Sequence, residues 1–248
     1  MPEDSAQFES NLVRQLASIG AWSAILLIVL TVFWIISLAM APAPPADASL
    51  TERFAFVRDN DGWQFLSFLA VVPMGLVHIP VWLGLAAVTW HIRPAMGLFA
   101  SAFGLFYGLL TVMGYWLQLT TVRGLGMLHQ EYPETAETLF PLIHFSGEPW
   151  SMPYGLVVIG YGVWGIAALF VGGALQGLPG VLGQWTAGLF AGAGVLGIIG
   201  GIGFVAQIGL LELGVLVSGI LFLPAIICAA VLMKRRGAPP SHDSALIR

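Results

Sequence analysis

A single histidine, His78, lies in the uncharged stretch VVPMGLVHIP between Pro73 and Pro80. An imidazole can bind a ligand or relay protons, and a neutral imidazole can also sit in a packed core if one partner donates to it and another accepts from it. Each proline lacks an amide hydrogen and can kink a helix, which leaves a carbonyl group that the ring could bond. Ionisable residues at membrane depth are often functional, so a structural and a functional role for His78 both stay open.

Three further polar residues, Thr111, Tyr115 and Gln118, are spaced so that they share one stripe of a helix. Because polar atoms that face lipid are costly, we expect this stripe to face the interior of a helix bundle. There it forms either hydrogen bonds between helices, each worth about 0.6 to 2 kcal/mol, or one wall of a ligand cavity. Tyr115 and Gln118 are candidate partners of His78. The candidate ligand-binding residues are therefore His78, Thr111, Tyr115 and Gln118, and no catalytic residue is assigned.

Residue types that bind metals occur in the segment 121–149, where His129, His144 and Glu148 are the candidates. Two histidines and one carboxylate can form a facial metal site. The segment contains no HExxH or similarly compact motif, and an acidic, solvated loop is the simpler explanation. No metal is assigned on this pattern.

Haem is a further possibility for His78, because His91 follows it by thirteen residues. This spacing resembles that of paired haem histidines on one helix in cytochromes of the b type. Such haems need a second axial ligand from another helix, and no other expected span contains a histidine. The cofactor is therefore left unknown.

The composition defines the elements that must position these residues. Of the 248 residues, 58% are hydrophobic and only 9% are charged, whereas soluble domains carry about a quarter charged residues. This balance is typical of a membrane protein. The net charge of -4 and the absence of a basic block exclude a nucleic-acid partner. The single cysteine, Cys228, cannot form an intrachain disulfide or a CxxC pair.

Long apolar runs predict helices that cross the membrane, since a span needs roughly 20 apolar residues to cross about 30 Å of hydrocarbon. We expect an all-α fold with one integral membrane domain, residues 1–248, built as a bundle of six transmembrane helices. The expected spans are 17–40, 63–90, 95–120, 150–175, 181–202 and 207–233. The turn between the last two must fall near GIIGGIGF, residues 197–204, because one helix over both runs would far exceed a bilayer.

Two shorter segments predict interfacial helices on the outer side of the membrane. In the segment 48–62, Leu50, Phe54 and Val57 lie at helical spacing, opposite charged positions. In the segment 132–145, Pro133 suits a first helical position, and Glu134 and Glu137 suit an early turn. Glycine is dense in the fifth span, where Gly188, Gly192, Gly197 and Gly201 predict close packing of helices. The letters GAGVLG, residues 192–197, fit a nucleotide motif but lack the strand that it requires.

The distribution of lysine and arginine predicts the orientation. Six of the nine basic residues fall on the side that carries both termini: Arg14, Arg93, Lys234, Arg235, Arg236 and Arg248. Positive residues favour the cytoplasmic side. We therefore expect a multi-pass protein of the bacterial inner membrane with both termini in the cytoplasm.

The run ERFAFVRDNDGWQFLSFLAVVPMGL, residues 52–76, together with the six-helix layout, resembles a family of bacterial membrane proteins known only as a domain of unknown function. The resemblance covers about the first half of the chain. It implies a six-helix bundle in a bacterial inner membrane and supplies no catalytic residue.

Two classes of function follow from these observations. The first is a non-enzymatic protein that binds an apolar ligand such as a lipid, quinone or pigment, or that serves as an accessory subunit of a membrane complex. Its partners would be membrane lipids and either other membrane subunits or further copies of the chain. The second is a membrane transporter or membrane enzyme that uses His78 and the polar stripe. We favour the first, since no compact catalytic motif is present and the glycine-rich faces suit packing against neighbours.

Overall fold

The computed structural model describes residues 2–45, 47–59, 61–145 and 151–238. In these residues the chain is helical, with no strand, and the elements run in the order α1 (Pro2–Met40), α2 (Leu50–Asp59), α3 (Asp61–Thr89), α4 (Pro94–Glu131), α5 (Pro133–Ile143), α6 (Met152–Leu175), α7 (Val181–Ala206) and α8 (Gly209–Gly237). Six of them are long and apolar enough to cross a membrane. The predicted all-α fold with six transmembrane helices is confirmed.

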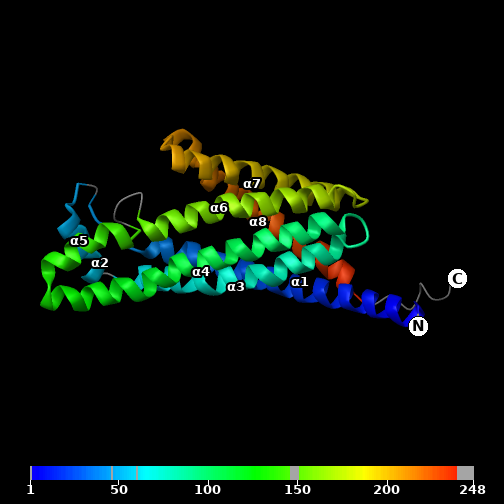
Figure 1. Ribbon diagram of the computed structural model, residues 1–248, viewed down its shortest axis with the longest axis horizontal. Helices are drawn as coiled ribbons and strands as arrows, with labels where there is room; N and C mark the ends of the chain where they lie inside the picture. The colour runs from blue at the N-terminus through cyan, green and yellow to red at the C-terminus, as the bar shows by residue number, and fades with distance from the viewer. Residues whose placement is uncertain (1, 46, 60, 146–150, 239–248) are drawn as a thin grey trace.

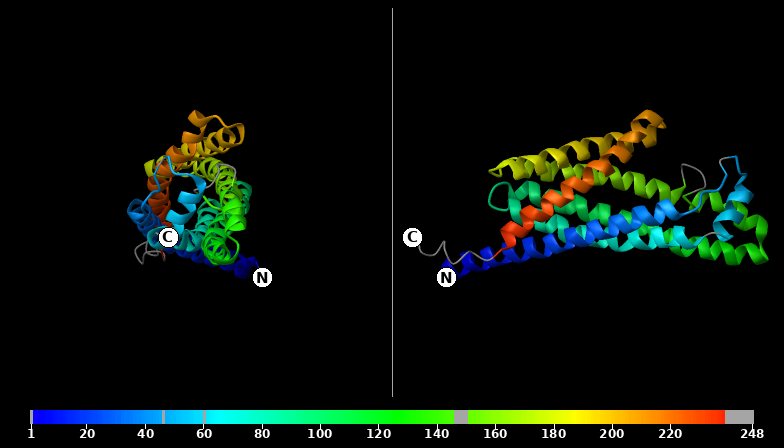
Figure 2. Two further views of the ribbon diagram at one scale, coloured as in Figure 1. Left: turned by 90° about the vertical axis from the view of Figure 1, so that its left-hand side faces the viewer. Right: turned by 180° about the vertical axis from the view of Figure 1, so that it is seen from behind.

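The six long helices form a closed ring (Figures 1 and 2). Each packs on the next along the chain, and α8 closes the ring against α1. The closing contact joins Gly237 of α8 to Ser18 of α1. Both helices that carry the chain ends therefore meet at one end of the bundle, as an even number of crossings requires. We call this the termini end.

Glycine lets the helix backbones approach closely at the seams of this ring. A Cβ atom added at Gly194 of α7 would stand 2.7 Å from the carbonyl oxygen of Gly165 in α6. The same close approach recurs at the pairs Gly20 and Gly84, Gly75 and Gly108, and Gly200 and Gly214. In lipid, where burial of apolar surface does not drive association, such contacts supply much of the packing energy.

The predicted glycine face of α7 is only partly correct. Gly197 and Gly201 do pack closely, and Gly201 meets the Cα atom of Gly162 in α6. Gly188 has nothing within 4 Å of its added Cβ, and Gly192 meets only the tip of Leu221. The seam with α6 uses Gly194 together with Gly197 and Gly201. At about 100° per residue, the five-residue step from Gly192 to Gly197 turns Gly188 and Gly192 away from this seam.

Two helices extend well beyond the expected spans. Helix α1 begins at Pro2 rather than at residue 17, and α4 continues to Glu131 rather than ending at residue 120. The 38 residues of α4 correspond to about 57 Å, against about 30 Å of hydrocarbon. A helix satisfies its own backbone hydrogen bonds in water as well as in lipid, so loss of hydrophobicity ends the span without ending the helix.

The predicted turn at residues 197–204 is wrong. Helix α7 runs on to Ala206, and the turn falls at Gln207 and Ile208, with Gln207 in the left-handed conformation at a φ of 56°. The glycines of the segment have another role, since an added Cβ at Gly203 would overlap the first turn of α8. They permit the two helices to meet at the turn, and they do not form it.

Helices α2 and α5 pack on the extension of α4 and form a structure that we call the cap. Both helices were predicted, and α5 begins at Pro133 as expected. Ser49 and Glu52 form a reciprocal capping box that starts α2. The backbone N–H of Ser49, which donates to the Glu52 carboxylate, holds the pKa of Glu52 below its usual range.

The apolar face of α2 is covered by protein and not by lipid. Phe54 and Val57 are buried, and they pack in a small core whose other members are Leu125, Ala136 and Phe140. The phenyl rings of Phe54 and Phe140 lie 5.3 Å apart. The cap therefore has its own core, separate from that of the bundle, at the end opposite the termini (Figure 1).

Candidate functional site

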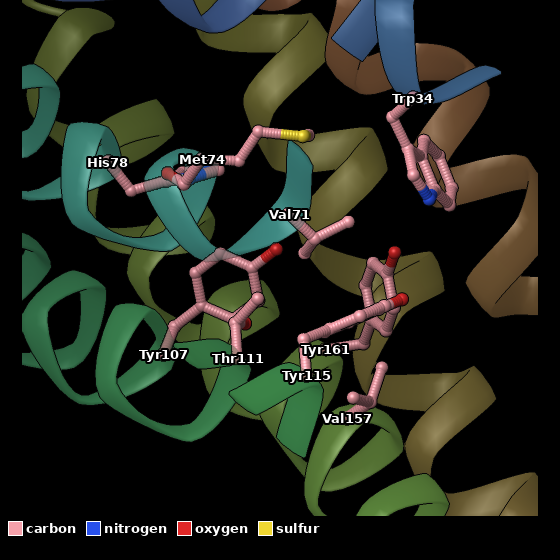
Figure 3. Close-up of a pocket in the computed structure, with 9 residues that line it drawn as sticks. All are labelled: Trp34, Val71, Met74, His78, Tyr107, Thr111, Tyr115, Val157 and Tyr161. Carbon is pink, nitrogen blue, oxygen red and sulfur yellow. The ribbon is translucent and has the colours of Figure 1, made fainter. Parts of the chain in front are cut away.

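A cavity lies between four helices in the half of the bundle nearest the cap (Figure 3). Its lining consists of Trp34 from α1, Val71, Met74 and His78 from α3, Tyr107, Thr111 and Tyr115 from α4, and Val157 and Tyr161 from α6. None of these nine residues is acidic, a lysine or an arginine. The site can therefore form hydrogen bonds but offers no ion pair to a charged ligand.

The free space in the cavity is small, about 30 Å³. This exceeds the roughly 10 to 15 Å³ that one water molecule needs, and it is far below the roughly 150 Å³ of a cavity that admits a benzene ring. The enclosed part accepts one oxygen-sized group, such as a water molecule or a terminal hydroxyl or carbonyl oxygen. It is too small for the ring of a quinone or a pigment, so most of a larger ligand would have to lie outside it.

His78 is almost fully buried, with 2% of its surface exposed. Its Nδ1 lies 2.7 Å from the carbonyl oxygen of Met74, one turn earlier in α3. A carbonyl oxygen can only accept, so Nδ1 donates. The Nε2 atom has no hydrogen-bond partner among the described residues. The ring stacks on Phe222 of α8 and meets Tyr107 edge-on, at 5.5 and 5.0 Å between centroids.

His78 bonds the carbonyl of Met74, and this carbonyl is not one of those that lose their helical donor to a proline. With bonds from each N–H to the carbonyl four residues earlier, Pro73 and Pro80 leave the carbonyls of Leu69 and Leu76 without a donor. Met74 instead shares its carbonyl oxygen between the helix and the imidazole. Neither Tyr115 nor Gln118 bonds the ring. The expected partners of His78 are thus replaced by one from its own helix.

Hydroxyl groups converge on the cavity from two helices. Figure 3 shows the hydroxyls of Tyr115 and Tyr161 on the side of the indole nitrogen of Trp34, with the hydroxyl of Tyr107 nearer to Val71. Tyr107 and Tyr161 are in ring contact at 6.2 Å. The Thr111 hydroxyl is buried and lies beside the hydroxyl of Tyr107, with which it interacts without reaching strict hydrogen-bond geometry. The predicted stripe therefore forms a wall of the cavity through Thr111 and Tyr115.

Gln118, the fourth predicted residue, does not line the cavity. Its Nε2 donates to the carbonyl oxygen of Ile143 at 2.7 Å, and its Oε1 accepts from the backbone N–H of Phe145 at 3.0 Å. The amide of Gln118 thus binds the backbone of the last residue of α5 and of the segment just after it. This anchoring places the ring of Phe145 against Tyr115 and Phe68, at 5.1 and 5.3 Å. Gln118 positions an aromatic cover at the cap side of the cavity.

Three cavity residues that carry a hydroxyl or indole N–H group were not predicted: Trp34, Tyr107 and Tyr161. Tyr107 precedes Thr111 by one helical turn, so the stripe could have been extended to include it. Trp34 and Tyr161 lie on other helices, and no spacing in the sequence connects them to His78. Their only signal is that each carries a polar tip inside an apolar span.

The candidate metal ligands occupy the cap. The ring of His129 packs on Phe54 at 5.0 Å, and its Nε2 lies 3.5 Å from the Glu137 carboxylate. His144 stacks on the other side of this core, on Phe140 at 4.8 Å. Burial lowers the pKa of His144 to about 4. No three metal-binding side chains come together in the part of the chain that the structure describes, and Glu148 lies outside that part.

Comparisons of this chain with protein-family models, curated proteins and solved structures found no match. The fold itself defines the class: the chain is a multi-pass integral membrane protein with six spanning helices. Within that class it carries an uncharged polar cavity between α1, α3, α4 and α6.

Proposed function

We propose that this protein is a non-enzymatic membrane protein that binds the oxygen-bearing end of an uncharged, membrane-soluble molecule, such as a lipid, quinone or pigment. One observation carries the proposal. The Nε2 of His78 is buried without a partner among the described residues, and it belongs to a side chain that lines a cavity rich in hydroxyl groups, among them those of Thr111 and Tyr107. Buried polar atoms are nearly always hydrogen-bonded in proteins, so the cavity is the place from which a small polar group can bond this nitrogen.

The surroundings of the cavity favour a ligand that arrives through the lipid. Helix α8 meets α1 at the termini end and diverges from it toward the cap (Figure 2). In the diverging half, side chains such as Leu213, Leu216 and Ile220 of α8 and Ile35 of α1 are exposed. Trp34, which is half-buried, stands at this side of the cavity. An apolar remainder of the ligand would lie against Trp34, with its oxygen inserted among the tyrosines.

We further propose the orientation and location that the charges indicate. At the termini end lie Arg14, Arg93, Lys234, Arg235 and Arg236, and the structure brings Arg93 onto α6, where its Nη1 donates to the carbonyl oxygen of Gly173 at 2.6 Å. Positive residues favour the cytoplasm. This supports a bacterial inner membrane protein with both termini in the cytoplasm and the cap outside. Membership of the six-helix family that the first half of the chain resembles is part of the same proposal.

The proposal is tested by what the purified protein retains. The native chain, the double variant Thr111→Val with Tyr161→Phe, and the control Thr120→Val would be purified in parallel. Thr120 is exposed and bonds only carbonyls of its own helix, so its loss leaves the cavity intact. Organic extracts would be compared by mass spectrometry, and the intact proteins by absorption spectra. We expect one small molecule to remain with the native chain and the control, and to fall at least about tenfold in the double variant.

Equal content in all three proteins would overturn the proposal. A native chain that retains no small molecule would favour an accessory subunit, which needs no ligand. The transporter alternative rests on the water-sized cavity beside an imidazole. It would be supported if the chain in sealed vesicles moved protons and His78→Ala stopped this flux.

A further inference from the structure

The hydrogen bonding of His78 restricts which oxygen the cavity can take. Resting on the proposed function, we propose that the ligand carries a hydroxyl group and that this hydroxyl donates a hydrogen bond to Nε2 of His78. Alcohols, phenols and quinols belong to this class. Ethers, ketones and oxidised quinones lack the hydrogen and do not.

The first step of the argument is the tautomer. The hydrogen of Nδ1 is committed to the Met74 carbonyl oxygen at 2.7 Å. An uncharged imidazole carries only one ring hydrogen, so Nε2 is then a bare acceptor. The rings that contact His78 belong to Tyr107 and Phe222, and the cavity that it lines contains no carboxylate. Nothing in these contacts favours the doubly protonated, charged ring.

The second step is the missing donor. No described group of the protein donates to Nε2, although the ring is 2% exposed. A buried acceptor without a partner destabilises the folded protein, because it has lost its hydrogen bonds to water. His78 lines the cavity, so the cavity is the place from which a donor can reach it. A molecule that brings a hydroxyl removes this cost, whereas a carbonyl or ether oxygen placed there would set two acceptors against each other.

The third step concerns the donor groups on the side of the cavity opposite His78. The hydroxyls of Tyr115 and Tyr161 and the indole nitrogen of Trp34 face the same space (Figure 3). Each of these groups can donate to the oxygen of a bound hydroxyl. The chemistry of a hydroxyl suits both walls, since it can donate to the imidazole and can accept from a donor of α1, α4 or α6. The free volume of about 30 Å³ fits one such group.

Matched probes test this selectivity. The full-length chain in lipid nanodiscs would be labelled with a photoreactive long-chain alcohol. Unlabelled 1-dodecanol, its methyl ether and 2-dodecanone would then compete for the labelled site. We expect the alcohol to compete about tenfold better than the ether or the ketone, as the loss of one hydrogen bond to a buried acceptor implies. In His78→Gln, whose amide can both donate and accept, we expect the preference over the ketone to disappear.

The outcomes separate this inference from the proposed function. Labelling that no competitor displaces would overturn the binding function itself. Displacement by all three competitors alike would leave the binding function standing and overturn the hydroxyl selectivity. A second measurement does not depend on the folding of a variant: nitrogen NMR of histidine-labelled native protein. The Nε2 resonance of His78 should shift when the alcohol is added and not with the ether, and a resonance that ignores the alcohol contradicts the inference.

Discussion

The indole ring of Trp82 in α3 lies in the space that a side chain at Gly104 of α4 would need, and an added Cβ there would overlap the indole. Trp82 is 1% exposed and also contacts Trp164 and Phe190. One of the two buried indoles of the bundle core is thus accommodated by the absence of a side chain on the neighbouring helix.

Gly104→Ala should therefore destabilise the protein. Overpacking of this kind costs about 1 to 3 kcal/mol, because the indole or the helix must move. The matched control is Gly188→Ala, since Gly188 has nothing within 4 Å of its added Cβ. We expect the thermal unfolding midpoint in detergent to fall for Gly104→Ala and to hold or rise for Gly188→Ala. Equal midpoints would show that Trp82 does not fill this space.

Gln118→Leu should loosen the segment after α5 without unfolding the bundle. The substitution keeps the size of the side chain but removes its two bonds to Ile143 and Phe145, worth together about 2 kcal/mol. We expect hydrogen exchange at the Phe145 amide to quicken by at least about tenfold, with exchange in α6 and α7 unchanged. Thr120→Val serves as the control. An unchanged Phe145 amide would mean that Gln118 does not hold the cover.

His144 should make the stability of the cap depend on pH. Its pKa is lowered to about 4 by burial, whereas a histidine in an unfolded chain titrates near about 6.5. Between these values the unfolded chain binds more protons, so the contribution of His144 is complete above about pH 6.5 and is lost as the pH falls toward 4. The loss should reach about 2 kcal/mol at pH 5.

His144→Phe checks the pH prediction, because phenylalanine preserves the ring that stacks on Phe140. Its unfolding midpoint should change less between pH 7 and pH 5 than that of the native chain. The exposed His91 provides the control substitution, His91→Phe. The prediction fails if the two variants show the same pH dependence.

The closure of the ring can be tested by a disulfide. An added Cβ at Gly237 would stand 3.1 Å from the Cβ of Ser18, close to the spacing of about 3.5 to 4.5 Å found in disulfides. With Cys228 replaced by serine, Ser18→Cys and Gly237→Cys should cross-link under mild oxidation, as a mobility shift on a gel would show. Ser18→Cys with Leu216→Cys should not cross-link, because Leu216 lies on the diverging half of α8. A cross-link in the second pair alone would refute the arrangement of α8.

The sequence predicted the membrane-spanning part of the fold because lipid, as the solvent of that part, restricts the backbone to helices. Lipid offers no hydrogen bonds to the backbone, so apolar runs longer than about 18 residues must be helices, and their number could be counted. The ends of α1 and α4 could not be predicted in this way, because a helix that leaves the lipid can continue in water. The turn before α8 was misplaced because glycine signals both turns and close packing, and only the neighbouring helix distinguishes them.

The candidate site was predicted only in part, because the helical period shows which residues share a face but not what each of them contacts. The period of the helix placed Thr111 and Tyr115 on one face, and this face does line the cavity with His78. Gln118 shares the face but lies about 10 Å further along the axis than Thr111, where it meets the segment after α5 instead of the cavity.

By itself the sequence determined the class of protein, the count of its spans and the faces of its helices, since these depend on local composition and on the pitch of one helix. Only the tertiary structure decided that Trp34 and Tyr161 join His78, that the Met74 carbonyl takes one nitrogen of its ring, and that the other nitrogen has no partner among the described residues. These facts depend on how closely glycine seams draw the helices together, and no spacing along a single chain records the distance between two helices.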